Sequence, residues 1–133
     1  MEKIVATLEM GKDGYGVWFN DISNVYAFGE TVEEAKKEAK EALEYFIEIS
    51  EKSNKTLPKA LQGEYELVFE FDTEALLKHV GNIVTQKALS KASLINPAQL
   101  SLYSSGQKKP RREQRERIIN GIHKLAKELS SVS

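Results

Sequence analysis

The sequence contains no cysteine and only two histidines, which excludes several kinds of functional site. Without cysteine there is no disulfide, no thiolate metal site and no cysteine nucleophile. His79 and His123 have no serine, cysteine or metal ligand at an informative spacing, so they indicate no catalytic residue and no metal site. No apolar run approaches the roughly eighteen residues of a membrane span, and the opening MEKIVATLEM lacks the pattern of a signal peptide. We therefore expect a cytoplasmic protein with no membrane association, no metal and no cofactor.

Charge is unevenly divided along the 133 residues, although the whole chain is nearly neutral at −1. Residues 1–72 contain 8 Lys and Arg against 16 Asp and Glu, net −8, whereas residues 73–133 contain 11 against 4, net +7. A basic half suits nucleic acid, and an acidic half suits a basic partner. The alternative, a long helix with a solvated acidic face, accounts for the first half but leaves the basic second half unexplained.

The first half begins with the alternation that is typical of β-strands. Residues 3–10 and 15–20 alternate apolar and polar side chains on either side of an Asp13-Gly14 hairpin turn. Residues 25–28 form a short third strand after a turn-rich stretch. These patterns predict a three-stranded meander.

A long helix and a fourth strand complete this half. Thr31 and Glu34 have the spacing of a capping box, and apolar residues then recur at helical spacing for about five turns. Residues 64–71 alternate again. The fold class predicted is therefore α+β: a small β-β-β-α-β domain over residues 1–72, followed by an all-α domain over residues 73–133.

Residues 85–106 contain the capping and ending signals of two short helices joined by a three-residue turn. Thr85 can cap the first helix, and Asn96 and Pro97 are a favoured cap and a favoured first residue for the second. Gly106 stands where a left-handed residue would end that helix. The pair matches the DNA-binding helix-turn-helix, whose second helix enters the major groove, although an ordinary helical hairpin is the alternative.

The stretch that follows is basic, which favours the DNA-binding interpretation. Six cations lie close behind Gly106: Lys108, Lys109, Arg111, Arg112, Arg115 and Arg117. Contact with phosphate requires only positive charge nearby, so such a cluster needs no exact placement. A basic surface that is merely solvated is the alternative.

Residues 19–43, FNDISNVYAFGETVEEAKKEAKEAL, resemble the HicB-type antitoxin domain. The matching positions are Phe19, Asp21, Gly29, Thr31, Glu34, Ala35, Ala39 and Ala42. The second half resembles the lambda-repressor-type helix-turn-helix that many members of that family append. The matching positions there are Leu89, Ser90, Ile95, Leu100, Ser101, Gly106 and Pro110.

The resemblance implies a truncated ribonuclease-H-like domain without catalytic activity, which binds a HicA-like ribonuclease toxin. It implies that the second domain binds double-stranded operator DNA and represses its own operon. The chain departs from the family pattern at the turn between the second and third strands, where Asn20, Ser23, Asn24 and Val25 replace prolines and a Gly-Cys pair. Leu94 replaces the glycine of the helix-turn-helix turn, and Pro97 replaces a glutamine that begins the second helix.

Eleven residues are assigned to DNA contact on this hypothesis: Gln86, Lys87, Asn96, Ala98, Gln99, Ser101, Ser105, Lys108, Lys109, Arg111 and Arg112. Gln99 is the best candidate for a base edge, because its amide can pair bidentately with adenine, and Ala98 suits a thymine methyl group. Gln86 is expected either to hydrogen-bond a phosphate or to brace the second helix. The basic residues are expected to contact phosphates.

The expected function is therefore an antitoxin and autorepressor that is at least a dimer, because operators of this class mirror a two-fold protein. One alternative is a stand-alone helix-turn-helix regulator whose HicB-like domain is non-catalytic and binds some other protein or itself. A metal-dependent nuclease built on Glu64, Glu66 and Glu70 is a weaker alternative, because the opposite face of that strand is the apolar one. We expect no enzymatic activity.

Overall fold

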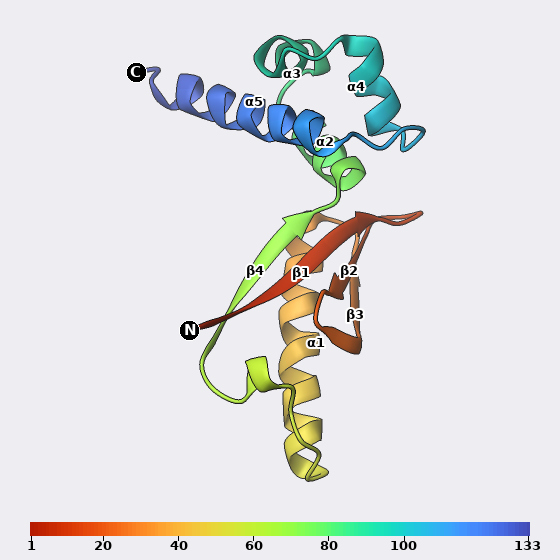
Figure 1. Ribbon diagram of the computed structural model, residues 1–133, viewed down its shortest axis with the longest axis vertical. Helices are drawn as coiled ribbons and strands as arrows, with labels where there is room; N and C mark the ends of the chain where they lie inside the picture. The colour runs from red at the N-terminus through yellow and green to blue at the C-terminus, as the bar shows by residue number, and fades with distance from the viewer. The chain divides into compact units, whose positions relative to one another are not determined.

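The computed structural model describes all residues from 1 to 133 (Figure 1). The chain forms two compact units, Met1–Asp72 and Thr73–Ser133, here called unit 1 and unit 2. A four-stranded sheet with one long helix makes up unit 1, and unit 2 is built from helices alone. The predicted α+β fold class is confirmed.

Unit 1 has the predicted β-β-β-α-β order, with one additional short 3₁₀ helix. Its elements are β1 (Glu2–Met10), β2 (Tyr15–Phe19), β3 (Ile22–Gly29), α1 (Val32–Lys52), η1 (Lys59–Leu61) and β4 (Tyr65–Phe71). The strands lie in the order β3-β2-β1-β4, with antiparallel pairing throughout the meander and β4 parallel to β1. The third strand is longer than predicted, because a register shift at Trp18 and Phe19 lets pairing begin at Ile22, next to the left-handed Asn24.

Helix α1 covers one face of the sheet (Figure 1). Its capping box forms as predicted, with the Thr31 hydroxyl oxygen accepting a hydrogen bond from the Glu34 backbone N–H at 3.1 Å. The first turns of α1 bury only the small side chains of Ala35 and Ala39 and can lie close to the sheet, and the larger Leu43 is buried one turn later. The strand residues beneath it, such as Ile4 and Leu8, are buried as the period-two pattern requires.

On the same face, the fourth strand is covered in part by a long polar side chain of α1. The Lys36 ammonium lies 5.5 Å from the centre of the Phe69 ring and 5.9 Å from that of Phe71, so a long polar side chain covers these aromatics. Burial and the nearby Glu44 carboxylate raise the pKa of the Tyr65 hydroxyl above its ordinary value. Both contacts place one side of α1 next to β4.

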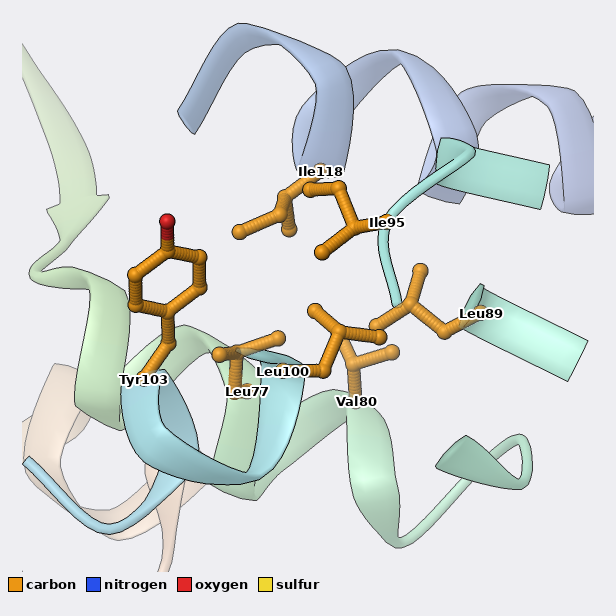
Figure 2. Close-up of a cluster of buried hydrophobic side chains, with 7 residues drawn as sticks. All are labelled: Leu77, Val80, Leu89, Ile95, Leu100, Tyr103 and Ile118. Carbon is orange, nitrogen blue, oxygen red and sulfur yellow. The ribbon is translucent and has the colours of Figure 1, made fainter. Parts of the chain in front are cut away.

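Unit 2 contains α2 (Thr73–Gly81), α3 (Gln86–Ser93), α4 (Pro97–Ser104) and α5 (Arg112–Ser130). All four helices and the turn before α4 contribute to its core, which consists of Leu77, Val80, Leu89, Ile95, Leu100, Tyr103 and Ile118 (Figure 2). A small core of this kind depends on each member, because a short domain buries a modest share of its surface. None of the helices in the chain has both the length and the apolar character needed to cross a membrane.

Candidate nucleic-acid interface

Helix α3 begins and ends with local contacts that the sequence specifies. The Thr85 hydroxyl oxygen accepts from the Ala88 backbone N–H at 3.0 Å, as expected of an N-cap. Leu94 ends the helix in the left-handed conformation, at φ 59° and ψ 35°, where the related pattern has glycine. The Ser90 hydroxyl donates to the Ile95 carbonyl and holds the turn from inside. The turn therefore comprises residues 94–96 and has the three-residue length that was predicted.

Helix α4 follows directly and has the predicted cap and stop. The Asn96 side-chain oxygen accepts from the Ala98 backbone N–H at 2.8 Å, and Pro97 occupies the first turn, where its missing N–H costs nothing. Gly106 has φ 78°, and its N–H donates to the Tyr103 carbonyl at 3.2 Å. These contacts fix where α4 begins and where it ends.

Gln86 braces the start of α4. Its side-chain Nε2 donates to the Pro97 carbonyl oxygen at 2.9 Å, joining the first residue of α3 to the first residue of α4. Of the two roles expected for Gln86, the structure contains the bracing contact. Because the side chain is otherwise exposed, its carbonyl oxygen and second N–H remain directed away from the core.

Gln99 is less available than its sequence position indicates. The side chain is half-buried, and its Nε2 donates to the Tyr103 hydroxyl at 2.8 Å, where Gln114 Nε2 also approaches at 3.5 Å. Tyr103 belongs to the core of unit 2, so its hydroxyl needs a partner at this edge (Figure 2). Bidentate pairing of Gln99 with a base would require this hydrogen bond to be exchanged.

The remaining candidates are exposed and fall into two groups along α4. Lys87 and Ala98 lie in the first turns of α3 and α4, whose starts the Gln86 contact holds together. A second group, Ser105, Lys108, Lys109, Arg111 and Arg112, follows the end of α4. Ser101 lies between the two groups. An eight-residue helix is about 12 Å long, so the two groups lie at opposite ends of a short helix whose other side is buried.

Two residues that hold this arrangement were missed by the sequence reasoning. Arg115, counted only among the cations, donates from Nη1 to the Thr73 hydroxyl at 2.7 Å and so ties α5 to the start of α2. Gly121 lies where α5 crosses α3, and a Cβ atom there would stand 2.9 Å from the Ser93 backbone. An isolated glycine inside a helical pattern often has such a packing reason, and that signal was present in the sequence.

Leu94→Gly is expected to raise the melting temperature by several degrees. A left-handed leucine costs about 1–2 kcal/mol, and the greater freedom of unfolded glycine offsets only part of that gain. Little packing is lost, because Leu94 is 80% exposed. Thermal unfolding of Leu94→Gly and of Leu102→Gly, a control inside α4 that should lower the melting temperature, measures the effect. An unchanged or lower value for Leu94→Gly would contradict a strained turn.

Comparison with known proteins gives one family. The family model described as the HicB-like antitoxin of bacterial toxin–antitoxin systems matches residues 4–96. The match covers unit 1, α2 and α3 and ends at the cap of α4. No curated protein matches the sequence.

Proposed function

The chain belongs to the HicB-like antitoxins of bacterial toxin–antitoxin systems, and from that premise we propose that it neutralises a HicA-like ribonuclease toxin and represses its own operon. Unit 1 would bind the toxin, and unit 2 would bind double-stranded operator DNA. The observation that carries the proposal is the coincidence of charge and architecture. Residues 1–72, net −8, make up one compact unit, and residues 73–133, net +7, make up the other.

An acidic unit suits a toxin that must itself bind RNA. A protein that contacts RNA presents positive charge to phosphates, and complementary charge speeds and selects its association with an acidic partner. The same acidity makes unit 1 a poor surface for nucleic acid. Each unit is thus suited to one class of partner and repels the other.

The α3–α4 pair has the form of a helix-turn-helix, with α4 as the recognition helix. The hydrogen bond from Gln86 to Pro97 joins the starts of the two helices, and Ala98 and Ser101 are exposed on α4. Pro97 has no donor for a base. Base contacts are therefore assigned to Ala98, Ser101 and, after exchange of its bond to Tyr103, Gln99. Lys87 and the basic segment after Gly106 would hold phosphates.

A second copy is required by the two-fold symmetry of operators that such motifs bind. In α5, the apolar residues Ile118, Ile122, Leu125 and Leu129 recur at helical spacing, and this stripe offers a contact surface for it. Ile118 at the start of the stripe is buried in the core, whereas Leu129 near its end is exposed, as is Val132 beyond the helix. We assign the exposed end of this stripe to the contact between two copies.

Removing phosphate contacts is expected to weaken operator binding and its dependence on salt. Lys108→Ala with Lys109→Ala should lower the magnitude of the slope of log affinity against log salt by about 2 and the affinity by about tenfold at 0.1 M salt. The matched control is Lys124→Ala with Lys127→Ala, which removes the same charge from the far part of α5 and should change the slope little.

Fluorescence anisotropy of a labelled promoter fragment, titrated with the full chain from 0.05 to about 0.3 M salt, measures both quantities. Sedimentation of the same complex gives its stoichiometry, expected at two chains per pair of half-sites. Equal slopes for the two double variants would show that Lys108 and Lys109 do not contact DNA phosphates. Absence of binding by the unaltered chain at the lowest salt would remove the DNA-binding proposal.

The antitoxin half of the proposal is tested by co-expression. A small basic reading frame next to the gene of this chain should stop growth when expressed alone, and the chain should restore growth. If growth is not restored, or no such reading frame exists, the chain is instead a stand-alone regulator whose first unit binds some other protein.

A further inference from the structure

The face of the sheet opposite α1, here called the outer face, carries three exposed aromatic side chains. Trp18 on β2 stands directly opposite Tyr26 on β3, and Phe28 on β3 stands opposite Gly16 on β2. The exposed fractions are 37% for Trp18, 73% for Tyr26 and 49% for Phe28. Helix α1, the long helix of unit 1, lies on the other side of the sheet (Figure 1). Large aromatics gathered in this way on a surface mark a contact site.

Carboxylate side chains lie on the same face, on the strands next to those that carry the aromatic side chains. Glu9 on β1 lies opposite Gly16, and Glu70 on β4 lies beside Thr7, whose other neighbour across the sheet is Trp18. Glu66 is paired in register with Lys3, which is the one cation on the outward side of the strands. The outer face is therefore aromatic near β3 and acidic toward β1 and β4.

Gly16 leaves a space between these two kinds of side chain. A Cβ atom placed there would meet nothing within 4 Å except the Glu9 side chain, at 3.8 Å. The position is bordered by Phe28 on one neighbouring strand and by Glu9 on the other, with Trp18 two residues along. The Phe28 ring leans toward the hairpin turn, where its tip would lie 2.9 Å from a Cβ atom at Gly14, and it leaves the space above Gly16 open. A guanidinium or ammonium group in that space would meet the Glu9 carboxylate and lie beside the aromatic side chains of β2 and β3.

We propose that the outer face, defined by Trp18, Tyr26, Phe28, Gly16 and Glu9, is the surface on which unit 1 binds a basic protein. An arginine or lysine of that partner would be seated above Gly16. The inference rests on the proposed function, which makes this partner the toxin. An open hollow at the turn between β2 and β3 extends the surface and adds the exposed Asp21 carboxylate next to Trp18 and Tyr26.

The charge of the surface selects this occupant over two others. Nucleic acid is repelled by Glu9, Glu66 and Glu70 and by the net −8 of unit 1. A second copy of the chain would bring two faces with an excess of carboxylates together, and like charges near each other oppose association. A partner with arginine or lysine on its contact face satisfies both the rings and the carboxylates.

The test compares two tyrosines of unit 1 that are similarly exposed. Tyr26 lies on the outer face, whereas Tyr45, 64% exposed, lies on α1. Binding of the full chain to the purified small basic protein encoded beside it, measured by calorimetry, should weaken at least about tenfold in Tyr26→Ala and less than about twofold in Tyr45→Ala. Gly16→Val, whose Cβ atom would approach only the flexible Glu9 side chain and no closer than 3.8 Å, should fill the space, weaken binding at least about tenfold and melt no lower than the unaltered chain.

A spectroscopic label reads the same surface without any substitution. Trp18 is the only tryptophan, so 5-fluorotryptophan gives a single ¹⁹F resonance from the outer face. That resonance should shift when the basic protein is added and stay in place when promoter DNA is added. If the unaltered chain binds the protein but Tyr26→Ala and Gly16→Val bind equally well and the resonance does not move, the surface is wrong and the antitoxin proposal stands. If the unaltered chain does not bind, both fall.

Discussion

Gly29→Ala is expected to lower the free energy of unfolding of unit 1 by about 3 kcal/mol or more, the upper end of the cost of overpacking. A Cβ atom at Gly29 would lie 2.2 Å from the Ala35 backbone nitrogen and 2.6 Å from Ala35 Cα. Both atoms belong to the first turns of α1, so no flexible side chain can yield. Strand β3 and helix α1 would have to separate, which would uncover the sheet.

The close contact arises from the path of the chain. β3 ends at Gly29, Thr31 caps α1, and the helix turns back at once onto the sheet. Urea unfolding followed by Trp18 fluorescence reports on unit 1 alone, because the chain has no other tryptophan. Gly63→Ala is the control, since a Cβ atom there meets nothing within 4 Å. A stability of Gly29→Ala equal to that of Gly63→Ala would show that the helix can shift without cost.

Leu100→Ala is expected to lower the stability of unit 2 by 2–5 kcal/mol, the range of the penalty for deleting a buried leucine side chain. Leu100 is 1% exposed and joins α4 to the core that α2, α3 and α5 build (Figure 2). This is a large share of the total for a domain of modest size. Loss of this core contact should also remove the proposed operator binding, because α4 would no longer be held next to Gln86.

The matched control is Leu102→Ala, an exposed leucine of the same helix, with an expected cost below about 1 kcal/mol. Thermal unfolding by circular dichroism gives the difference in stability, and hydrogen exchange measured by mass spectrometry should locate the loss of protection in residues 73–133. Similar destabilisation by the two variants would mean that the core does not fix α4 through Leu100.

Predictions from the sequence succeeded where a neighbouring residue supplies the partner. Thr31, Thr85 and Asn96 each cap a helix through a backbone N–H two or three residues away, so the pattern of residues suffices to locate the contact. The period-two pattern placed Ile4 and Leu8 on the buried face of the sheet for a similar reason, because alternation is a property of a single strand. The family resemblance over unit 1 also held.

Prediction failed or stayed incomplete where the partner is distant in the chain. The length of β3 depends on a register shift against β2, and the bracing role of Gln86 depends on where α4 begins. Gln99 has the right chemistry for a base edge, but its environment is set by Tyr103 and by Gln114 on another helix. DNA contact by the eleven assigned residues remains a prediction.

The sequence by itself determined the α+β fold class, the order of the elements and the opposite charges of the two halves, because propensity, capping and composition are properties of short segments. Only the tertiary structure decided which surfaces stay open. The pattern puts Trp18, Tyr26 and Phe28 on the outward side of their strands, but whether another element covers that side depends on how the chain folds back. It is the position of α1 on the opposite face that leaves these aromatics, and the space above Gly16, available to a partner.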